Sequence, residues 1–284
     1  MSASFLLPLE QQVIVITGAS SGIGLCTARL AAARGACVVL IARSGDAIYQ
    51  ACDEIAEAGG RAIAAPADVA SREQLEAAAQ AAIDAFGRID TWINNAGVSI
   101  HGRLDQVTDE DSKRLFATNF WGVVNGSLVA MPHLEKQGGA LINVGSAATS
   151  APLSLQGMYA CSKAAVQSFT DTLRVEVQDV DRSPVSITLI QPAAVNTPHA
   201  VHAANYLGEP PVQPTPALDP VEVAEAILRA ATEGGRDVQV GMVPVVVTGT
   251  TQCKPSLGER VATRSEGALH QPGKSGRTHG STVS

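Results

Sequence analysis

Short apolar runs alternate with alanine-rich segments of helical period along most of this chain, and that alternation constrains its fold most strongly. Several of the runs, such as 13–16 and 37–42, contain no polar residue between the apolar ones. Uninterrupted apolar strands are typical of a sheet that is covered on both faces. Strands that alternate with helices form parallel sheets, because each connection crosses over the sheet. The sequence therefore predicts an α/β fold with a doubly wound parallel sheet in a single domain.

The period of the apolar residues predicts the individual elements. We expect strands at 13–17, 37–42, 61–66, 89–95, 140–146, 185–192 and 237–241. We expect helices at 22–34, 46–58, 71–86, 108–131, 157–180 and 220–234. Ser71 is suited to cap the third helix, and Thr108 with Asp111 could form a capping-box-like pair at the start of the fourth. The fourth helix should bend or stop near Pro132.

Two segments lack a regular period. Residues 193–220 are rich in proline, and we expect them to form a substrate lid within a folded domain that spans 1–253. The segment 254–284 is rich in Gly, Ser, Thr, Arg and Lys and poor in apolar residues. Such a segment cannot bury enough surface to offset its conformational entropy, so we expect a flexible, basic, disordered C-terminal tail.

Composition and charge limit the classes of partner and the cellular location. The net charge of −7 argues against nucleic acid or an anionic membrane as main partner, because both require a basic surface. The five cysteines include no CxxC pair, so we interpret them as free thiols in a reducing compartment, with no metal site. The first residues contain no signal-like basic segment, and no apolar run is long enough to span a bilayer. We therefore expect a cytoplasmic protein.

The motif TGASSGIG directly follows the first expected strand and leads into the first expected helix. Gly18, Gly22 and Gly24 permit a tight turn and let a phosphate approach the backbone. The helix N-terminus then offers N–H groups and a partial positive charge, to which Ser20 and Ser21 add hydroxyl donors. This turn of a doubly wound sheet is where dinucleotides bind. A glycine-rich connector without a ligand is the alternative interpretation.

The end of the second strand distinguishes the two nicotinamide cofactors. A carboxylate there would bind the ribose 2′-hydroxyl of NAD, whereas an arginine would bind the 2′-phosphate of NADP. Here Ala42 is followed by Arg43, whose planar guanidinium suits a phosphate, so we predict NADP(H). An ordinary solvent-exposed loop arginine is the alternative.

Two more motifs follow the third and fourth strands. Asp68 could accept a hydrogen bond from the adenine amino group or cap the helix that begins nearby, and the sequence leaves both options open. The NNAG motif at 94–97 places small and amide residues where they can approach the adenine side of a dinucleotide and brace the centre of the sheet.

Tyr159 and Lys163 stand at positions i and i+4 of one expected helix, so their side chains share a face. A nearby ammonium lowers the pKa of tyrosine from about 10, so Tyr159 could act as a general acid–base near neutral pH. Ser146 ends the preceding strand and could hold a substrate oxygen beside Tyr159. Asn119 is a polar residue inside a helix, and it could bind a water that passes protons from Lys163. Each residue alone could equally be ordinary core or surface.

These motifs occur together in the order and spacing of the short-chain dehydrogenase/reductase (SDR) family, which the chain resembles from about 12 to 241. The resemblance implies a Rossmann-type fold and hydride transfer to or from the nicotinamide, by a tetrad of Asn119, Ser146, Tyr159 and Lys163. The cofactor-binding residues that it implies are Gly18, Ser20, Ser21, Gly22, Ile23, Gly24, Arg43, Asp68, Val69, Asn95, Ala96, Gly97, Tyr159, Lys163, Val195 and Thr197. Among these, Lys163 would bind the nicotinamide ribose, and Val195 and Thr197 the carboxamide.

One residue departs from the family pattern. The family's Pro-Gly after the sixth strand is Pro192–Ala193 here, which leaves the geometry of that turn open. The resemblance also implies a homodimer or homotetramer, packed through the helices that carry Asn119 and Tyr159. Neither the turn nor the oligomeric state changes the reacting groups of the site.

The sequence does not identify the substrate. We expect a small-molecule carbonyl or alcohol, chosen by the lid and by the loop at 98–103, and acyl-carrier ketones, steroids, sugars and simple aldehydes all remain open. His199, His202 and Tyr206 in the lid receive no role. Two other functions compete with the oxidoreductase: a catalytically silent NADP-binding sensor, and an epimerase or dehydratase without net redox. A sensor would not need the Tyr159 base, and the third class usually carries a larger C-terminal substrate domain.

Overall fold

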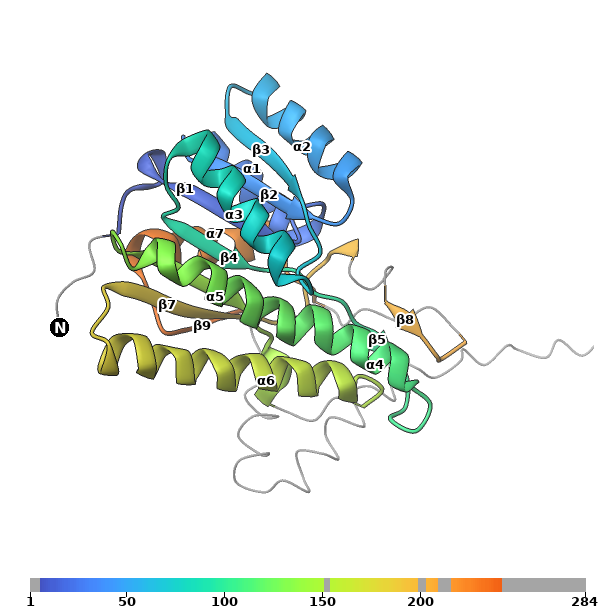
Figure 1. Ribbon diagram of the computed structural model, residues 1–284. Coiled ribbons are helices and arrows are strands. Elements are labelled where there is room, and N and C mark those ends of the chain that lie inside the picture. Colours follow the sequence, from blue (N-terminus) through green and yellow to red (C-terminus); the bar gives the residue numbers. More distant parts are fainter. Residues whose placement is uncertain (1–5, 151–153, 199–202, 209–215, 242–284) are drawn as a thin grey trace, which may run out of the picture.

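The structure of the protein is a computed structural model, and it describes residues 6–150, 154–198, 203–208 and 216–241 (Figure 1). The predicted tail at 254–284 lies outside the described residues, as do His199 and His202 of the predicted lid. Within the described part, no helix combines the length and the apolar character needed to cross a membrane.

Seven parallel strands form the centre of the molecule (Figure 1). Their spatial order is β3-β2-β1-β4-β6-β7-β9, and every neighbouring pair is parallel. The order runs outward from β1 on one side and outward from β4 on the other, which confirms the predicted Rossmann-type, doubly wound sheet. The strands are β1 (Val13–Thr17), β2 (Cys37–Ala42), β3 (Arg61–Pro66), β4 (Thr91–Asn94), β6 (Gly139–Val144), β7 (Val185–Pro192) and β9 (Asp237–Val240).

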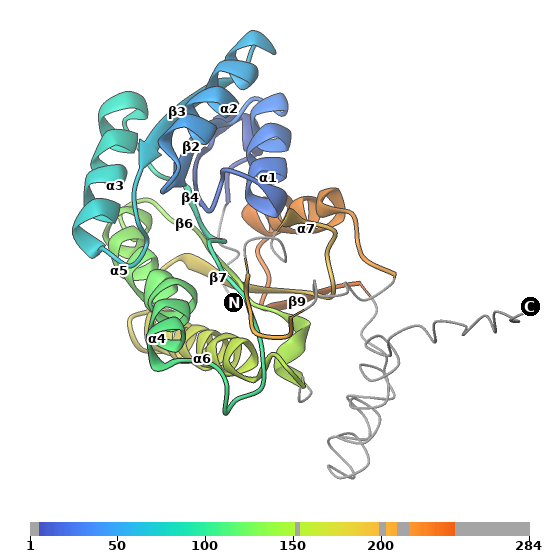
Figure 2. The same ribbon diagram turned by 90° about the vertical axis from the view of Figure 1, so that its right-hand side faces the viewer.

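Helices cover both faces of this sheet (Figure 2). On one face lie α1 (Gly22–Ala33), α2 (Gly45–Glu57) and α7 (Pro220–Glu233). On the other face lie α3 (Arg72–Phe86), α5 (Gly122–Leu134) and α6 (Gly157–Arg174), with α4 (Asp109–Phe116) leading into α5. Three alternating layers result, as the sequence predicts.

The core explains why the strands read as unbroken apolar runs. Ile14 and Ile16 point into the layer of α1 and α7, while Val13 and Val15 of the same strand point into the layer of α3 and α5. All four side chains are buried. Because successive residues of a strand face opposite sides, a strand between two helical layers must be apolar at every position.

The helix predicted at 108–131 is interrupted by a π-helical turn, Ala117–Trp121, which separates α4 from α5. Pro132 lies in the last turn of α5, which ends at Leu134, so the predicted stop near Pro132 is confirmed. Proline removes the hydrogen bond to the carbonyl four residues earlier, which is that of Leu128. The helix nevertheless continues for two residues beyond Pro132.

A second, two-stranded sheet was not predicted. It pairs β5 (Ile100–His101), in the loop after NNAG, with β8 (Ala204–Asn205), in the predicted lid. Two-residue strands are too short to show a period in the sequence. The pairing joins the loop at 98–103 to the predicted lid, the two segments expected to choose the substrate.

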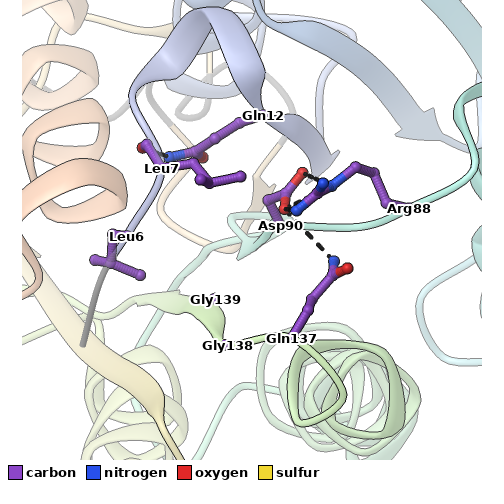
Figure 3. Close-up of a pocket in the computed structure, with 8 residues that line it drawn as sticks. All are labelled: Leu6, Leu7, Gln12, Arg88, Asp90, Gln137, Gly138 and Gly139. Atoms are coloured by element: carbon purple, nitrogen blue, oxygen red, sulfur yellow. Dashed lines mark hydrogen bonds and ion pairs between the residues drawn. The ribbon is translucent and has the colours of Figure 1, made fainter.

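A small polar pocket lies at the amino-terminal edge of the main sheet (Figure 3). Asp90 accepts hydrogen bonds there from the Arg88 guanidinium at 2.6 Å and from the Val13 N–H at 2.8 Å. Gln12 donates to the Ala231 carbonyl at 2.9 Å. These side chains use one another and the nearby backbone as hydrogen-bond partners, and they connect β1, β4 and α7. We therefore interpret the pocket as structural; it lies at the edge opposite the glycine-rich turn.

Candidate active site

The carboxyl ends of β1 and β4 lie side by side where the strand order reverses, and the glycine-rich turn stands there. Gly18 has a φ of +66°, and a Cβ on it would lie 2.7 Å from the Ala96 Cα. Gly22 has a φ of +55°, and a Cβ there would lie 3.2 Å from the Thr197 side chain. Both positions therefore exclude larger residues. The crowding comes from the protein's own backbone and side chains, which the sequence does not predict.

Thr17 and Asn95 hold this turn against the end of β4. The Thr17 hydroxyl accepts hydrogen bonds from the N–H groups of Asn95 at 2.9 Å and Ala96 at 3.1 Å. The Asn95 amide donates to the Thr17 carbonyl at 2.9 Å and to the Gly18 carbonyl at 3.3 Å. The predicted bracing role of NNAG is thus seen in the structure. Thr17 was missed, although a hydroxyl that ends an apolar strand is a signal for it.

The start of α1 presents the predicted phosphate-binding groups. Ser21 occupies the N-cap in an extended conformation, and its side chain makes no cap hydrogen bond. Ser20, Ser21, Gly22 and Ile23 are partly exposed. The first-turn N–H groups of a helix need acceptors, and here the cap supplies none. An anion would satisfy them.

Arg43 directly follows β2 at the same edge of the sheet, and its side chain is exposed. Within the described ranges it forms no hydrogen bond or ion pair. Both the predicted 2′-phosphate contact and the alternative of an ordinary exposed arginine agree with this position. The cofactor preference therefore stays a prediction.

Asp68 does not cap α3, so one of its two proposed roles is excluded. Ser71 caps that helix, as predicted, by accepting from the Gln74 N–H. The Asp68 carboxylate instead accepts from the Ala70 N–H at 3.0 Å, which closes a local turn. Val69 beside it is buried and fills the space above Gly122. Contact with adenine remains the prediction for Asp68.

The four predicted catalytic residues converge around Gly97. A Cβ on Gly97 would lie 3.5 Å from Asn119 Oδ1 and 3.7 Å from Lys163 Nζ. Lys163 Nζ lies 6.0 Å from the centre of the Tyr159 ring, and the side chains of Tyr159 and Ser146 share a hydrogen bond. The four residues come from three segments of the chain, since Tyr159 and Lys163 share α6, and they meet at the carboxyl ends of β4 and β6.

Burial controls the charge of the two ionisable groups. Lys163 is 4% exposed, and its ammonium donates to the Val144 carbonyl at 2.9 Å. Burial lowers the pKa of Lys163 to about 8. Burial raises the pKa of Tyr159, and the hydrogen bond with Ser146 lowers it by less. The predicted lowering of the Tyr159 pKa is therefore not seen in the protein by itself, because burial of this half-buried side chain raises the pKa more than the Ser146 hydrogen bond lowers it.

Asn119 lies in the π-helical turn and is fully buried. Its Oδ1 accepts from the Val98 N–H at 2.8 Å, and its Nδ2 donates to the Val98 carbonyl at 2.9 Å and to Ser162 Oγ at 3.0 Å. Ser162 in turn donates to the Tyr159 carbonyl at 2.7 Å. Both amide protons of Asn119 are donated within the protein, so its side chain positions the loop of Val98 and α6. The water relay stays a prediction.

A buried polar network below these residues was missed. Asn94 Nδ2 donates to Asn143 Oδ1 at 2.9 Å and to Ser127 Oγ at 3.1 Å, and Asn143 Nδ2 donates to Thr170 Oγ1 at 2.9 Å. The network joins β4, β6, α5 and α6, and thus fixes the helix of Tyr159 on the sheet. Asparagine within an apolar strand, as at 143, is the sequence signal that could have revealed it.

At the position of the departure, the backbone of Ala193 pairs with β9. The Ala193 N–H donates to the Val240 carbonyl at 2.9 Å, and Ala193 is not among the described residues with positive φ. Val195 pairs with Leu218 in a parallel bridge, and Thr197 lies against Gly22. The predicted carboxamide contacts therefore stand beside the glycine-rich turn, which agrees with the prediction without testing it.

Comparisons with known proteins agree with this fold and site. The family model described as short chain dehydrogenase matches residues 12–205, and the chain belongs to that family. It is similar to an uncharacterized oxidoreductase, YxnA, of Bacillus subtilis (strain 168), with 45% identity over 90% of this chain and 72% of the relative. Homologous proteins of the family are oxidoreductases, so the chain is an SDR oxidoreductase by descent.

Two solved structures share the fold and carry nicotinamide dinucleotides. One is a short chain dehydrogenase/reductase from Burkholderia phymatum in complex with NAD, with a TM-score of 0.79, 27% identity and coverage of 89% of this chain and 96% of that one. The other is an alcohol dehydrogenase from Thermococcus sibiricus complexed with 5-hydroxy-NADP, with a TM-score of 0.71, 26% identity and coverage of 81% and 95%. Dinucleotides of both kinds therefore occur on this fold.

Proposed function

We propose that the protein is an NADP(H)-dependent oxidoreductase that transfers a hydride between the nicotinamide C4 and the carbon of a small carbonyl or secondary alcohol. The observation that carries the proposal is the cluster of Ser146, Tyr159 and Lys163, in which a phenol, a hydroxyl and a buried ammonium meet at the ligand-binding edge of the sheet. General acid–base catalysis needs such a proton donor next to a group that holds the reacting oxygen.

The residues around the first turn fit a dinucleotide. The N–H groups at the start of α1 and the hydroxyls of Ser20 and Ser21 would hold the pyrophosphate. Arg43 supports NADP(H) rather than NAD(H), because it is exposed and unpaired within the described residues at the end of β2. The family resemblance adds Asp68 and Val69 at the adenine, Asn95, Ala96 and Gly97 beside it, and Val195 and Thr197 at the carboxamide.

Each residue of the cluster has one task in this proposal. The bound cofactor supplies or accepts the hydride. In reduction, Tyr159 gives its phenolic proton to the carbonyl oxygen as the alcohol forms, and in oxidation it takes that proton back. Ser146 holds the same oxygen by a hydrogen bond. The Lys163 ammonium, protonated at neutral pH because its pKa is about 8, stabilises the tyrosinate left after proton transfer and binds the nicotinamide ribose.

The proposal includes a homodimer or homotetramer in a reducing, cytoplasmic environment. Trp121 is 54% exposed and Val175 49% exposed, on the π-helical turns next to α5 and α6. A second copy of the chain would cover such large apolar side chains. The cysteines within the described residues, Cys26, Cys37, Cys52 and Cys161, are free thiols, as expected where thiols stay reduced.

The experiment that tests the reaction measures NADPH consumption and alcohol formation together. The purified protein is incubated with NADPH and each of a panel of ketones and aldehydes, and both products are quantified. A reductase forms one alcohol for each NADPH oxidised. A silent sensor would bind NADPH without consuming it, and an epimerase or dehydratase would convert substrate without net oxidation of NADPH. Either of these results would overturn the proposed reaction.

A further inference from the structure

The hydroxyl of Tyr206, in the predicted lid, is inserted into the N-cap of α4. Thr108 Oγ1 accepts from the Asp111 N–H at 3.2 Å, as predicted for a cap. The predicted capping-box-like pair is nevertheless incomplete without Tyr206. Tyr206 Oη accepts from the Thr108 N–H at 3.3 Å and donates to Asp111 Oδ2 at 2.6 Å. The phenol therefore stands where the carboxylate would otherwise complete the box.

The backbone and the ring of Tyr206 are held from the same side. Its N–H donates to the His101 carbonyl at 2.8 Å, which continues the pairing of β5 with β8. A Cβ on Gly102 would lie 2.9 Å from the Tyr206 Cβ, so any larger residue at 102 would push the tyrosine away. Three attachments thus fix one lid residue on the segment that connects β4 to α4.

This segment also touches the start of the helix that carries Tyr159. The Gly102 N–H donates to the Leu155 carbonyl at 2.7 Å, and Gln156 Nε2 lies 3.0 Å from a ring nitrogen of His101. Gln156 is the residue before α6, and Tyr159 lies in the first turn of that helix. The lid residue, the loop and the catalytic helix therefore form one connected assembly.

We propose that Tyr206 is a positioning residue of the substrate site: its hydroxyl fixes lid residues 204–207 on the N-terminus of α4, and thereby fixes the wall of the pocket that receives the carbonyl compound. The inference rests on the proposed reductase function. Among the described residues, the Tyr206 hydroxyl forms its hydrogen bonds with Thr108 and Asp111 and with no residue of the Tyr159–Lys163 pair or the glycine-rich turn. Its loss should therefore change the affinity for the carbonyl compound and leave cofactor binding and proton transfer in place.

The first test measures hydrogen–deuterium exchange in the protein without any ligand. Tyr206→Phe keeps the ring against Gly102 and removes only the hydroxyl, and Tyr49→Phe on α2, whose side chain is 54% exposed, is the matched control. We expect faster exchange of the amides at 100–111 and 203–208 in Tyr206→Phe alone. Unchanged exchange there would overturn the inference. This readout needs no turnover, so it separates failure of the inference from failure of the proposed reaction.

The second test is kinetic and uses the compound that the wild type reduces fastest among 4-nitrobenzaldehyde, an acetoacetyl thioester and a 3-ketosteroid. Without its hydroxyl, Tyr206 loses its hydrogen bonds with the Thr108 N–H, the Thr108 hydroxyl and the Asp111 carboxylate, which should raise KM about tenfold. The kcat and the Kd for NADPH should stay within about twofold of the wild type and of Tyr49→Phe. A fall in kcat at unchanged KM, or an equal loss of NADPH affinity, would overturn the inference.

Discussion

The Lys163 ammonium lies 6.0 Å from the centre of the Tyr159 ring and is held there by the Val144 carbonyl at the end of β6. A buried ammonium without an acceptor would lose its proton more readily than one that donates to a carbonyl. With a pKa of about 8, Lys163 remains mostly protonated at neutral pH. The pair thus combines a protonated phenol, which can act as an acid, with a positive charge that stabilises its anion.

Tyr159→Phe should abolish turnover while sparing the site. General acid–base catalysis contributes about 10²- to 10⁴-fold, so we expect kcat to fall by at least about 100-fold and the Kd for NADPH to change less than about twofold. Steady-state NADPH oxidation and fluorescence titration check the two parts. Tyr49→Phe, on the exposed side of α2, is the control and should retain full activity. Substantial turnover by Tyr159→Phe would refute its role as acid–base.

Arg43→Ala should weaken NADPH binding selectively. Loss of charged hydrogen bonds to a 2′-phosphate should raise the Kd for NADPH about 10- to 100-fold, while NADH, which lacks that phosphate, should bind as before. Parallel titrations of the two cofactors give the comparison. Arg72→Ala is the matched control, since Arg72 is an exposed arginine that pairs only with Glu76 on α3 within the described residues. Equal losses for both cofactors would remove the case for NADP(H).

Gly18→Ala and Gly59→Ala separate backbone strain from close packing. Both glycines have positive φ, +66° and +84°, so both substitutions should cost about 1–2 kcal/mol in backbone strain. Only at Gly18 does the new Cβ meet another atom, the Ala96 Cα at 2.7 Å. We expect urea denaturation to show at least about 1 kcal/mol more destabilisation for Gly18→Ala, from overpacking. NADPH binding should weaken in that variant alone, and equal effects would contradict the proposed geometry.

The depressed pKa of Lys163 predicts a pH dependence of stability. Between the folded value of about 8 and the ordinary value of 10.5, the unfolded chain binds more protons at this group than the folded protein does. The free energy of unfolding should therefore rise with pH across this range. From pH 7.5 to pH 9.5 the contribution of Lys163 amounts to about 2 kcal/mol.

Comparison of the wild type with Lys163→Met isolates this contribution, because all other titrating groups are shared. Urea denaturation at several pH values below 9.5 avoids the titration of Tyr159, whose pKa is raised and whose contribution has the opposite sign at higher pH. We expect the wild-type protein to gain stability relative to the variant as the pH rises. If the difference in free energy of unfolding between wild type and variant stays constant with pH, burial does not lower the pKa of Lys163.

The sequence predicts the sheet well because its signals are local and repeated. All seven strands of the sheet are present, since an apolar run such as 37–42 between helical segments has few other ways to be buried. The predicted cap by Ser71 is confirmed too, because a serine at the N-cap is also a local signal. The glycine-rich turn is where the motif predicts it.

What the sequence does not predict depends on tertiary contacts. Tyr206 completes the cap of α4 from almost a hundred residues away, and β5 pairs with β8 across a similar separation. Partial burial in the fold raises the pKa of Tyr159, whereas its spacing from Lys163 predicts the opposite. Each outcome is decided by burial or by distant partners, which neighbouring residues do not encode.

The most direct test of the central claim follows the hydride itself. NADPH that carries deuterium at the transferred position of C4 is incubated with wild-type protein and an accepted carbonyl compound, and the alcohol is examined by mass spectrometry. We predict one deuterium on the carbinol carbon of the alcohol, and at least about 100-fold slower formation of the alcohol with Tyr159→Phe. Alcohol without deuterium, or no alcohol from any ketone or aldehyde while NADPH binds, would contradict the proposed oxidoreductase.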